Sequence, residues 1–273
     1  MTLNTALRNI ACSAALLVAA PLASAHSLWI LPGDFNISGD SDKWVTVDVS
    51  ASNTIFKADK SIDLKGLMVT APDGTTTPLA SFTEGKRRSV FDIELPAQGS
   101  WKLQMQSGPR YMTFYTDAEG KHQRLFMDKQ KAKAKLPKGA TEVMSWAGHR
   151  NTLTYITRGA PTAEVLQPQG KGLELTFTTH PNDIVAGEPV QMTLLFNGKP
   201  APKMELELTA DGTRYRDNRA VLALHTDSKG QFSFTPAQAG RYMLSADKEQ
   251  DSTNERADKM GWSLLLTFEA QLP

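Results

Sequence analysis

Cysteine is the residue that this chain most plainly lacks: its 273 residues include one, Cys12, near the N-terminus. A single thiol forms no internal disulfide, and structural zinc sites of the thiolate type need several cysteines. If the N-terminal segment that holds Cys12 is removed, the mature chain has no cysteine. We therefore expect the fold to depend on its hydrophobic core.

The chain also lacks a surplus of charge of either sign, since 30 Lys and Arg stand against 29 Asp and Glu. Proteins that bind nucleic acid or an anionic membrane usually carry a basic excess. The balance argues against both kinds of partner.

Common catalytic motifs are missing as well. The sequence contains no G-x-S-x-G nucleophile elbow, no H-E-x-x-H zinc motif and no glycine-rich phosphate loop. No pair of acids stands out by its spacing. We therefore expect a protein that is not an enzyme.

Long apolar runs are missing except at the start. Residues 1–9 carry one charge, Arg8, residues 10–22 are almost wholly apolar, and Ala23-Ser24-Ala25 fits signal peptidase. The apolar run is shorter than the roughly 20 residues of a membrane-spanning helix. These features predict a signal peptide over 1–25, a periplasmic location, and a mature chain of 248 residues that begins at His26 and does not insert into the membrane.

Short apolar runs separated by Gly, Pro, Asp and Asn predict an all-β protein. We expect two immunoglobulin-like β-sandwich domains in tandem, at 26–160 and 172–273, joined by a linker over 161–171. Asp128–Lys135 is the one segment that looks helical. The expected strands are Trp44–Ser50, Leu67–Ala71, Ser89–Leu95, Trp101–Gln106, Tyr111–Thr116, Thr152–Thr157, Leu173–Thr179, Val190–Phe196, Met204–Thr209, Ala220–His225, Gln231–Thr235, Tyr242–Ala246 and Trp262–Phe268.

The chain repeats itself at an offset of roughly 140 residues. The stretch from Phe91 to Trp101 resembles the stretch from Phe232 to Tyr242, and each contains a Pro-Ala-Gln turn followed by glycine and an aromatic residue. The repeat predicts two related strand–turn–strand units, one in each half.

His26 is the strongest candidate for a metal ligand. Cleavage after Ala25 would leave a free α-amino group on the residue that carries the imidazole, and the two nitrogens suit copper, nickel or zinc. Signal peptidase cuts before many residue types, so His26 is also compatible with no function at all.

Four other histidines follow, and none forms an H-x-x-x-H pair. His180, at the end of an expected strand, and His149, in an expected loop, are the next candidate metal ligands. His122 and His225 rank lower. Each of these four, taken singly, also fits an ordinary polar surface residue.

Several segments together resemble the DUF4198 family. The chain's His26-Ser27-Leu28-Trp29-Ile30-Leu31-Pro32 is similar to the mature start of that family, and the second half agrees at Gly172–Leu175, Ala186–Val190, Leu195–Pro200, Thr226–Phe234 and Ala239–Tyr242. The resemblance implies a periplasmic component associated with nickel or cobalt uptake, with His26 as candidate ligand. The chain departs from the pattern at His180, where an aspartate or asparagine is expected before Pro181.

These observations lead to a hypothesis with two rivals. We expect a periplasmic protein that binds a divalent transition metal ion, nickel or cobalt with copper or zinc as further candidates, through His26, His180 and His149. Its expected partner is a metal-uptake membrane complex. One rival is a module that binds a protein or glycan without metal through loops of the sandwiches. A sugar-binding platform could come from Trp29, Trp44, Trp101, Trp146 and Trp262, although core packing explains these tryptophans better. The other rival is a copper oxygenase with a histidine brace.

Overall fold

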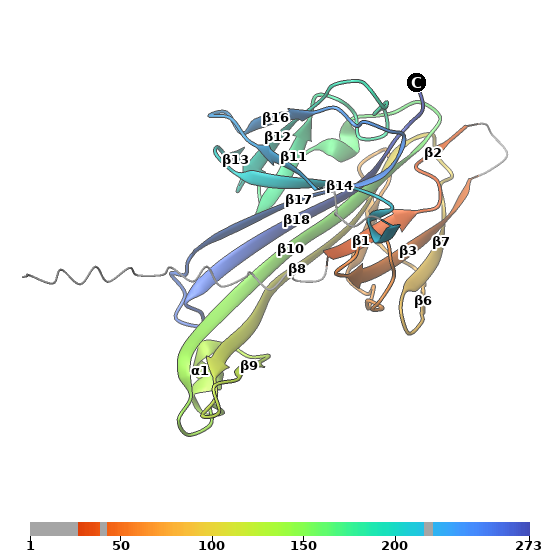
Figure 1. Ribbon diagram of the computed structural model, residues 1–273. Helices are drawn as coiled ribbons and strands as arrows, with labels where there is room; N and C mark the ends of the chain where they lie inside the picture. The colour runs from red at the N-terminus through yellow and green to blue at the C-terminus, as the bar shows by residue number, and fades with distance from the viewer. Residues whose placement is uncertain (1–26, 39–42, 216–220) are drawn as a thin grey trace, which may run out of the picture.

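A computed structural model describes residues 27–38, 43–215 and 221–273, and its strands form three sheets (Figure 1). The N-terminal sheet has the order β1-β3-β7-β6, with bounds Ser27–Pro32, Trp44–Ser52, Ser89–Glu94 and Thr83–Glu84. The C-terminal sheet is built on β12 (Val190–Phe196), which pairs with β11 (Leu173–Phe177), β13 (Lys199–Pro200) and β16 (Gln231–Phe234). Both pack against the third and largest sheet.

This central sheet takes strands from both halves of the chain. Its order is β15-β14-β17-β18-β10-β8-β4-β5, with β2 (Asn36–Ile37) on β10 and β9 (His122–Leu125) on β8. The parallel pairing of β10 with β18, in which Leu153 lies opposite Leu266, joins the two halves. The other bounds are β15 (Leu222–His225), β14 (Glu205–Ala210), β17 (Gly240–Asp251), β18 (Lys259–Ala270), β10 (Thr141–Arg158), β8 (Gly99–Thr116), β4 (Leu67–Thr70) and β5 (Thr76–Pro78).

Each face of the central sheet carries one of the two large hydrophobic cores. Successive side chains of a strand point to opposite faces. On β10, Ile156 is fully buried with Ile30 in the core under the N-terminal sheet, while Leu153 and Tyr155 belong to the core under the C-terminal sheet. Both cores therefore depend on β10, and one strand fixes the position of both small sheets.

The internal repeat corresponds to two strand–turn–strand units, each of which connects a small sheet to the central sheet. In the first half β7 of the N-terminal sheet turns into β8 of the central sheet, and in the second half β16 of the C-terminal sheet turns into β17. The aromatic residue of each unit closes its turn, because Trp101 Nε1 donates to the carbonyl of Ala97 (3.1 Å) and Tyr242 Oη donates to that of Gln238 (2.7 Å). The predicted pair of related units is confirmed.

Strands β8 and β10 extend beyond the sandwiches as a long arm, with the end of the β17–β18 hairpin beside it (Figure 1). At the tip lie β9 and the short helix α1 (Lys129–Lys133). The Asp128 carboxylate caps α1 by accepting from the Lys131 amide at 2.9 Å, and it also accepts from the Arg256 guanidinium at 2.8 Å. The β17–β18 turn thus supports the arm.

The all-β class is confirmed, and the predicted helix is present in shortened form. The division into domains 26–160 and 172–273 stays a prediction, because the two cores are distinct but share the central sheet. The 161–171 segment is more than a connecting linker, since it forms η1 (Glu164–Leu166) and buries Val165 in the second core. A further 3₁₀ turn, η2, spans Thr213–Tyr215.

Three predictions lie wholly or partly outside the described residues: the signal peptide over 1–25, His26, and Ala220 at the start of an expected strand. Within the described part of the chain, no helix is long and apolar enough to cross a membrane.

Candidate functional site

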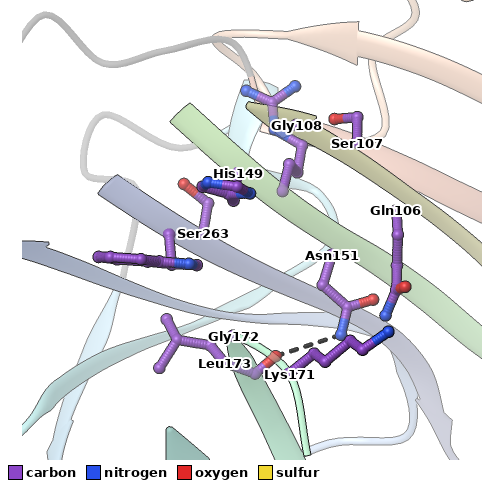
Figure 2. A pocket seen from close by; sticks show the side chains of 11 residues that line it. Gln106, Ser107, Gly108, His149, Asn151, Lys171, Gly172, Leu173 and Ser263 are labelled. Carbon is purple, nitrogen blue, oxygen red and sulfur yellow. Dashed lines mark hydrogen bonds between the residues drawn. The ribbon is translucent and has the colours of Figure 1, made fainter. Parts of the chain in front are cut away.

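An open groove of about 280 Å³ lies at the base of the arm, where β8, β10 and β18 meet the segment that leads into β11 (Figure 2). Its wall is formed by the strands of the central sheet on one side and by Lys171, Gly172 and Leu173 on the other. The remaining lining residues are Gln106, Ser107, Gly108, His149, Arg150, Asn151, Trp262 and Ser263.

Two stacked rings form the aromatic part of the groove. His149 and Trp262 lie opposite each other on β10 and β18, and their rings stack with centroids 5.6 Å apart at 10°. The other side of the indole packs edge-on against Phe196 at 4.9 Å, which connects it to the second core. Trp262 is therefore packed against the second core and also lines the groove. The expectation that the tryptophans pack in the core describes only the first of these two positions.

One ring nitrogen of His149 is not used within the described part of the protein. Its Nε2 atom is buried and has no hydrogen-bond partner in the described structure. Burial lowers the pKa of His149 below its ordinary value, which favours the neutral ring with a free lone pair. Depending on the tautomer, this Nε2 atom accepts a hydrogen bond from a ligand or donates one to it.

Amide and ammonium groups line the rest of the groove. Asn151 is held in place, because its Oδ1 accepts from Gln104 Nε2 (2.8 Å) and its Nδ2 donates to the carbonyl of Leu173 (3.2 Å). Gln106 and Lys171 are exposed, and their side chains approach one another across the groove (Figure 2). Neither side chain has a partner among the described residues, so both are available to a ligand.

His180 lies elsewhere and is fully engaged. Its Nε2 lies 3.0 Å from Ser100 Oγ and 3.1 Å from the carbonyl of Thr162, while its Nδ1 accepts from the Asn182 amide at 3.1 Å. Both ring nitrogens are used within the protein. A metal ion would have to displace these bonds, so we assign His180 a structural role.

The structure does not bring His149 and His180 together. Ser100, the partner of His180, pairs with Thr157 on β10, eight positions beyond His149, which corresponds to roughly 26 Å along a strand. One ion cannot reach both rings. His122 and His225 are exposed on β9 and β15 and join neither position.

His26 falls outside the described residues, but its neighbour Ser27 begins β1, opposite Ser52. Strand β1 belongs to the sheet on one face of the central sheet, whereas His149 lies beside Leu173 on the other face. In the described part of the chain no three His, Cys, Asp or Glu side chains gather as a metal site would require.

Sequence reasoning missed Gln106, Asn151 and Lys171 as groove residues. A signal was present in β8, where Trp101, Leu103 and Met105 alternate with Lys102, Gln104 and Gln106. That alternation marks one face of the strand as polar. Nothing local shows that β10 and the segment before β11 lie against that polar face.

Comparisons with known proteins place the chain in a family without a known activity. Residues 23–250 match the model of a domain of unknown function, DUF4198. No curated protein matches the chain. Among solved structures, the D0–D1 domain of Intimin is similar at 12% identity over 88% of this chain and 96% of that one, with a TM-score of 0.21.

Two further structures are similar at the same distant level. The Yersinia pseudotuberculosis adhesin InvE matches at 12% identity over 88% of this chain and 58% of that chain, with a TM-score of 0.21. A DUF3823 family protein from Bacteroides uniformis matches at 9% identity over 90% and 100%, with a TM-score of 0.24. These likenesses are too distant to carry an argument about function. The match over most of the length, together with the N-terminal and turn motifs, shows that the chain belongs to the DUF4198 family.

Proposed function

We propose that this protein is exported to the periplasm and binds a divalent transition metal ion, nickel or cobalt, through the α-amine and imidazole of His26, in support of metal uptake. The observation that carries the proposal is the position of His26 directly before β1. That strand is paired with β3 along its whole length, and Leu28, Trp29 and Ile30 are buried. A chelating residue next to such a strand is attached to a fixed point of the fold.

The geometry argues against two of the three candidate metal ligands, His180 and His149. His180 uses both ring nitrogens internally, and His149 lies on the opposite face of the central sheet from β1. The proposed site therefore contains the two nitrogens of His26 and leaves the remaining coordination positions to water or to a partner. Open positions suit a carrier, because a metal-uptake membrane complex can take the ion by ligand exchange.

The test is a calorimetric titration of the processed protein with nickel, cobalt, copper and zinc, after mass spectrometry has confirmed His26 as the N-terminus. His26→Ala is expected to abolish binding of the preferred ion. His149→Ala and His122→Ala serve as matched controls and are expected to bind normally. No binding by correctly processed protein, or equal binding by His26→Ala, refutes the proposal.

A second candidate function has its own observation. The stacked rings of His149 and Trp262, with the unpartnered side chains of Gln106 and Lys171, form a groove that combines an aromatic surface with hydrogen-bonding groups. This combination is typical of sites for small polar ligands such as sugars, and the volume of about 280 Å³ is close to the lower end of ligand pockets.

This alternative predicts a change in Trp262 fluorescence when a sugar binds. Gln106→Ala and Lys171→Ala should weaken that response, while Lys199→Ala, which changes an exposed lysine outside the groove, should leave it intact. A response that survives both groove substitutions would exclude the groove as the site.

A further inference from the structure

The tip of the arm concentrates positive charge that the composition of the chain conceals. We define the arm tip as residues 117–140, which connect the end of β8 to the start of β10. It contains seven Lys and Arg against three Asp and Glu, a formal charge of +4. The rest of the chain has 23 against 26, or −3. The near-neutral total thus hides a separation of charge along the molecule.

Most of the positive groups at the arm tip are unpaired. In the described structure Lys129 forms an ion pair with Asp258, and the acid Asp128 is paired with Arg256. The other lysines of the tip have no acidic partner there. Four of them lie on or just after α1 and are exposed to solvent: Lys131, Lys133, Lys135 and Lys138. Among the described residues none of these four forms a salt bridge, although the charge of Lys131 helps to lower the pKa of Asp128.

An exposed aromatic side chain lies among these cations. Phe126, between β9 and α1, has 73% of its surface exposed, and the Arg124 guanidinium lies 5.3 Å from its ring centre. On β10, which is separated from β9 by β8, Val143 and Met144 are 42% and 37% exposed. Large apolar groups at this exposure, within a basic surface, are characteristic of segments that lie in a membrane interface.

The arm presents this surface away from both sandwiches. Strand β8 has 18 residues, which at about 3.3 Å per residue gives a length of roughly 60 Å. The arm tip lies at its far end (Figure 1). An end-on contact therefore does not bring the two sandwiches near the partner, although the end of the β17–β18 hairpin lies beside the tip, where Asp258 pairs with Lys129.

We propose that the arm tip docks end-on onto an anionic phospholipid surface. The exposed lysines contact lipid phosphates, and Phe126 enters the interface between headgroups and acyl chains. Charge complementarity favours this partner: basic residues near an anionic leaflet add to one another, and an aromatic ring adds apolar burial that a soluble polyanion does not offer. The contact is peripheral and reversible, and it is independent of the proposed metal site.

The experiment is co-sedimentation of the mature protein with vesicles of phosphatidylcholine, pure or mixed with phosphatidylglycerol. We expect binding to the mixed vesicles, none to the pure ones, and release at about 0.5 M salt. Replacing Lys131, Lys133, Lys135 and Lys138 by Gln should lower binding by roughly 100-fold or more. Phe126→Ala should lower it by about tenfold.

The chain offers matched controls for both changes. Lys57, Lys86, Lys199 and Lys229 are also exposed and lie outside the arm tip, and their joint replacement by Gln should leave binding unchanged. Tyr215 is 76% exposed with Arg214 over its ring at 4.4 Å, so Tyr215→Ala is the control for Phe126→Ala.

Three outcomes overturn the proposal. The first is that anionic vesicles are not bound, and the second is that both lysine sets cause equal losses. The third is tip-dependent binding of a soluble acidic polypeptide that is insensitive to Phe126→Ala and blocks the vesicles, which would identify an acidic protein as partner instead.

Discussion

The imidazole of His180 joins Thr162, in the segment between the two halves, to Ser100, at the start of β8. The contacts are 3.1 Å to the Thr162 carbonyl and 3.0 Å to Ser100 Oγ, and Ser100 Oγ in turn accepts from the Thr162 amide at 3.0 Å. His180→Ala removes the donor to a half-buried carbonyl. We expect a loss of about 1–3 kcal/mol in the free energy of unfolding, measured in urea. His225→Ala, an exposed control, should cost far less. Equal losses of unfolding free energy in the two variants would show that the hydrogen bonds of His180 do not stabilise the fold.

The stability should depend on pH through the same residue. Burial lowers the pKa of His180, against the opposing effects of the Thr162 carbonyl and Asp183. The unfolded chain then binds protons more readily than the folded one below about pH 6.5, so stability is full above that value and falls as the pH decreases. Urea unfolding at about pH 7.5 and about pH 5 measures the fall. The fall should be smaller in His180→Gln, and an unchanged fall would contradict this origin.

Trp146 lies directly over Gly261 where the arm leaves the sandwiches. A Cβ atom on Gly261 would lie 1.8 Å from Trp146 Cζ2, so one of the two must move. Gly261→Ala should cost about 1–3 kcal/mol in unfolding free energy. The same change in a Trp146→Ala background should cost less than about 1 kcal/mol. Gly66→Ala, where nothing lies within 4 Å, is the control, and additive losses would disprove the contact.

The Asp128 carboxylate holds the arm tip together through α1 and Arg256. The Lys131 amide and the Arg256 guanidinium lower the pKa of Asp128, so it is charged at neutral pH. Asp128→Ala should cost about 1–2 kcal/mol and increase amide hydrogen exchange at Lys131 and Ala132. Lys133→Ala, on the same helix, tests for a general effect of substitution. Exchange that is equally slow in Asp128→Ala would mean that the cap is dispensable.

Local patterns predicted the strands best where one strand is bounded by clear turns. Val190–Phe196 is β12 to the residue. Strand β8 was predicted as two strands, 101–106 and 111–116, because Ser107-Gly108-Pro109 resembles a turn. The chain continues through it because the ladder with β10 resumes on both sides of a register shift.

The features that could not be predicted from the sequence are contacts between residues far apart in the chain. The parallel pairing of β10 with β18 joins residues more than a hundred positions apart, and no local pattern encodes it. His180, at the end of an expected strand, was a candidate ligand because its partners Ser100 and Thr162 lie 80 and 18 residues away in the sequence. The pairing of His149 with Trp262 was hidden for the same reason. Strand β1, which the structure places over Ser27–Pro32, was not among the expected strands.

The most direct test of the metal proposal keeps the His26 imidazole and removes its free amine. Nickel is titrated by calorimetry into the processed protein and into the same protein with an uncleaved Gly-Ser-Gly-Ser extension before His26. Because the proposed chelate needs both nitrogens, the extension should lower affinity by at least about tenfold. Equal affinity in the two proteins would contradict the account.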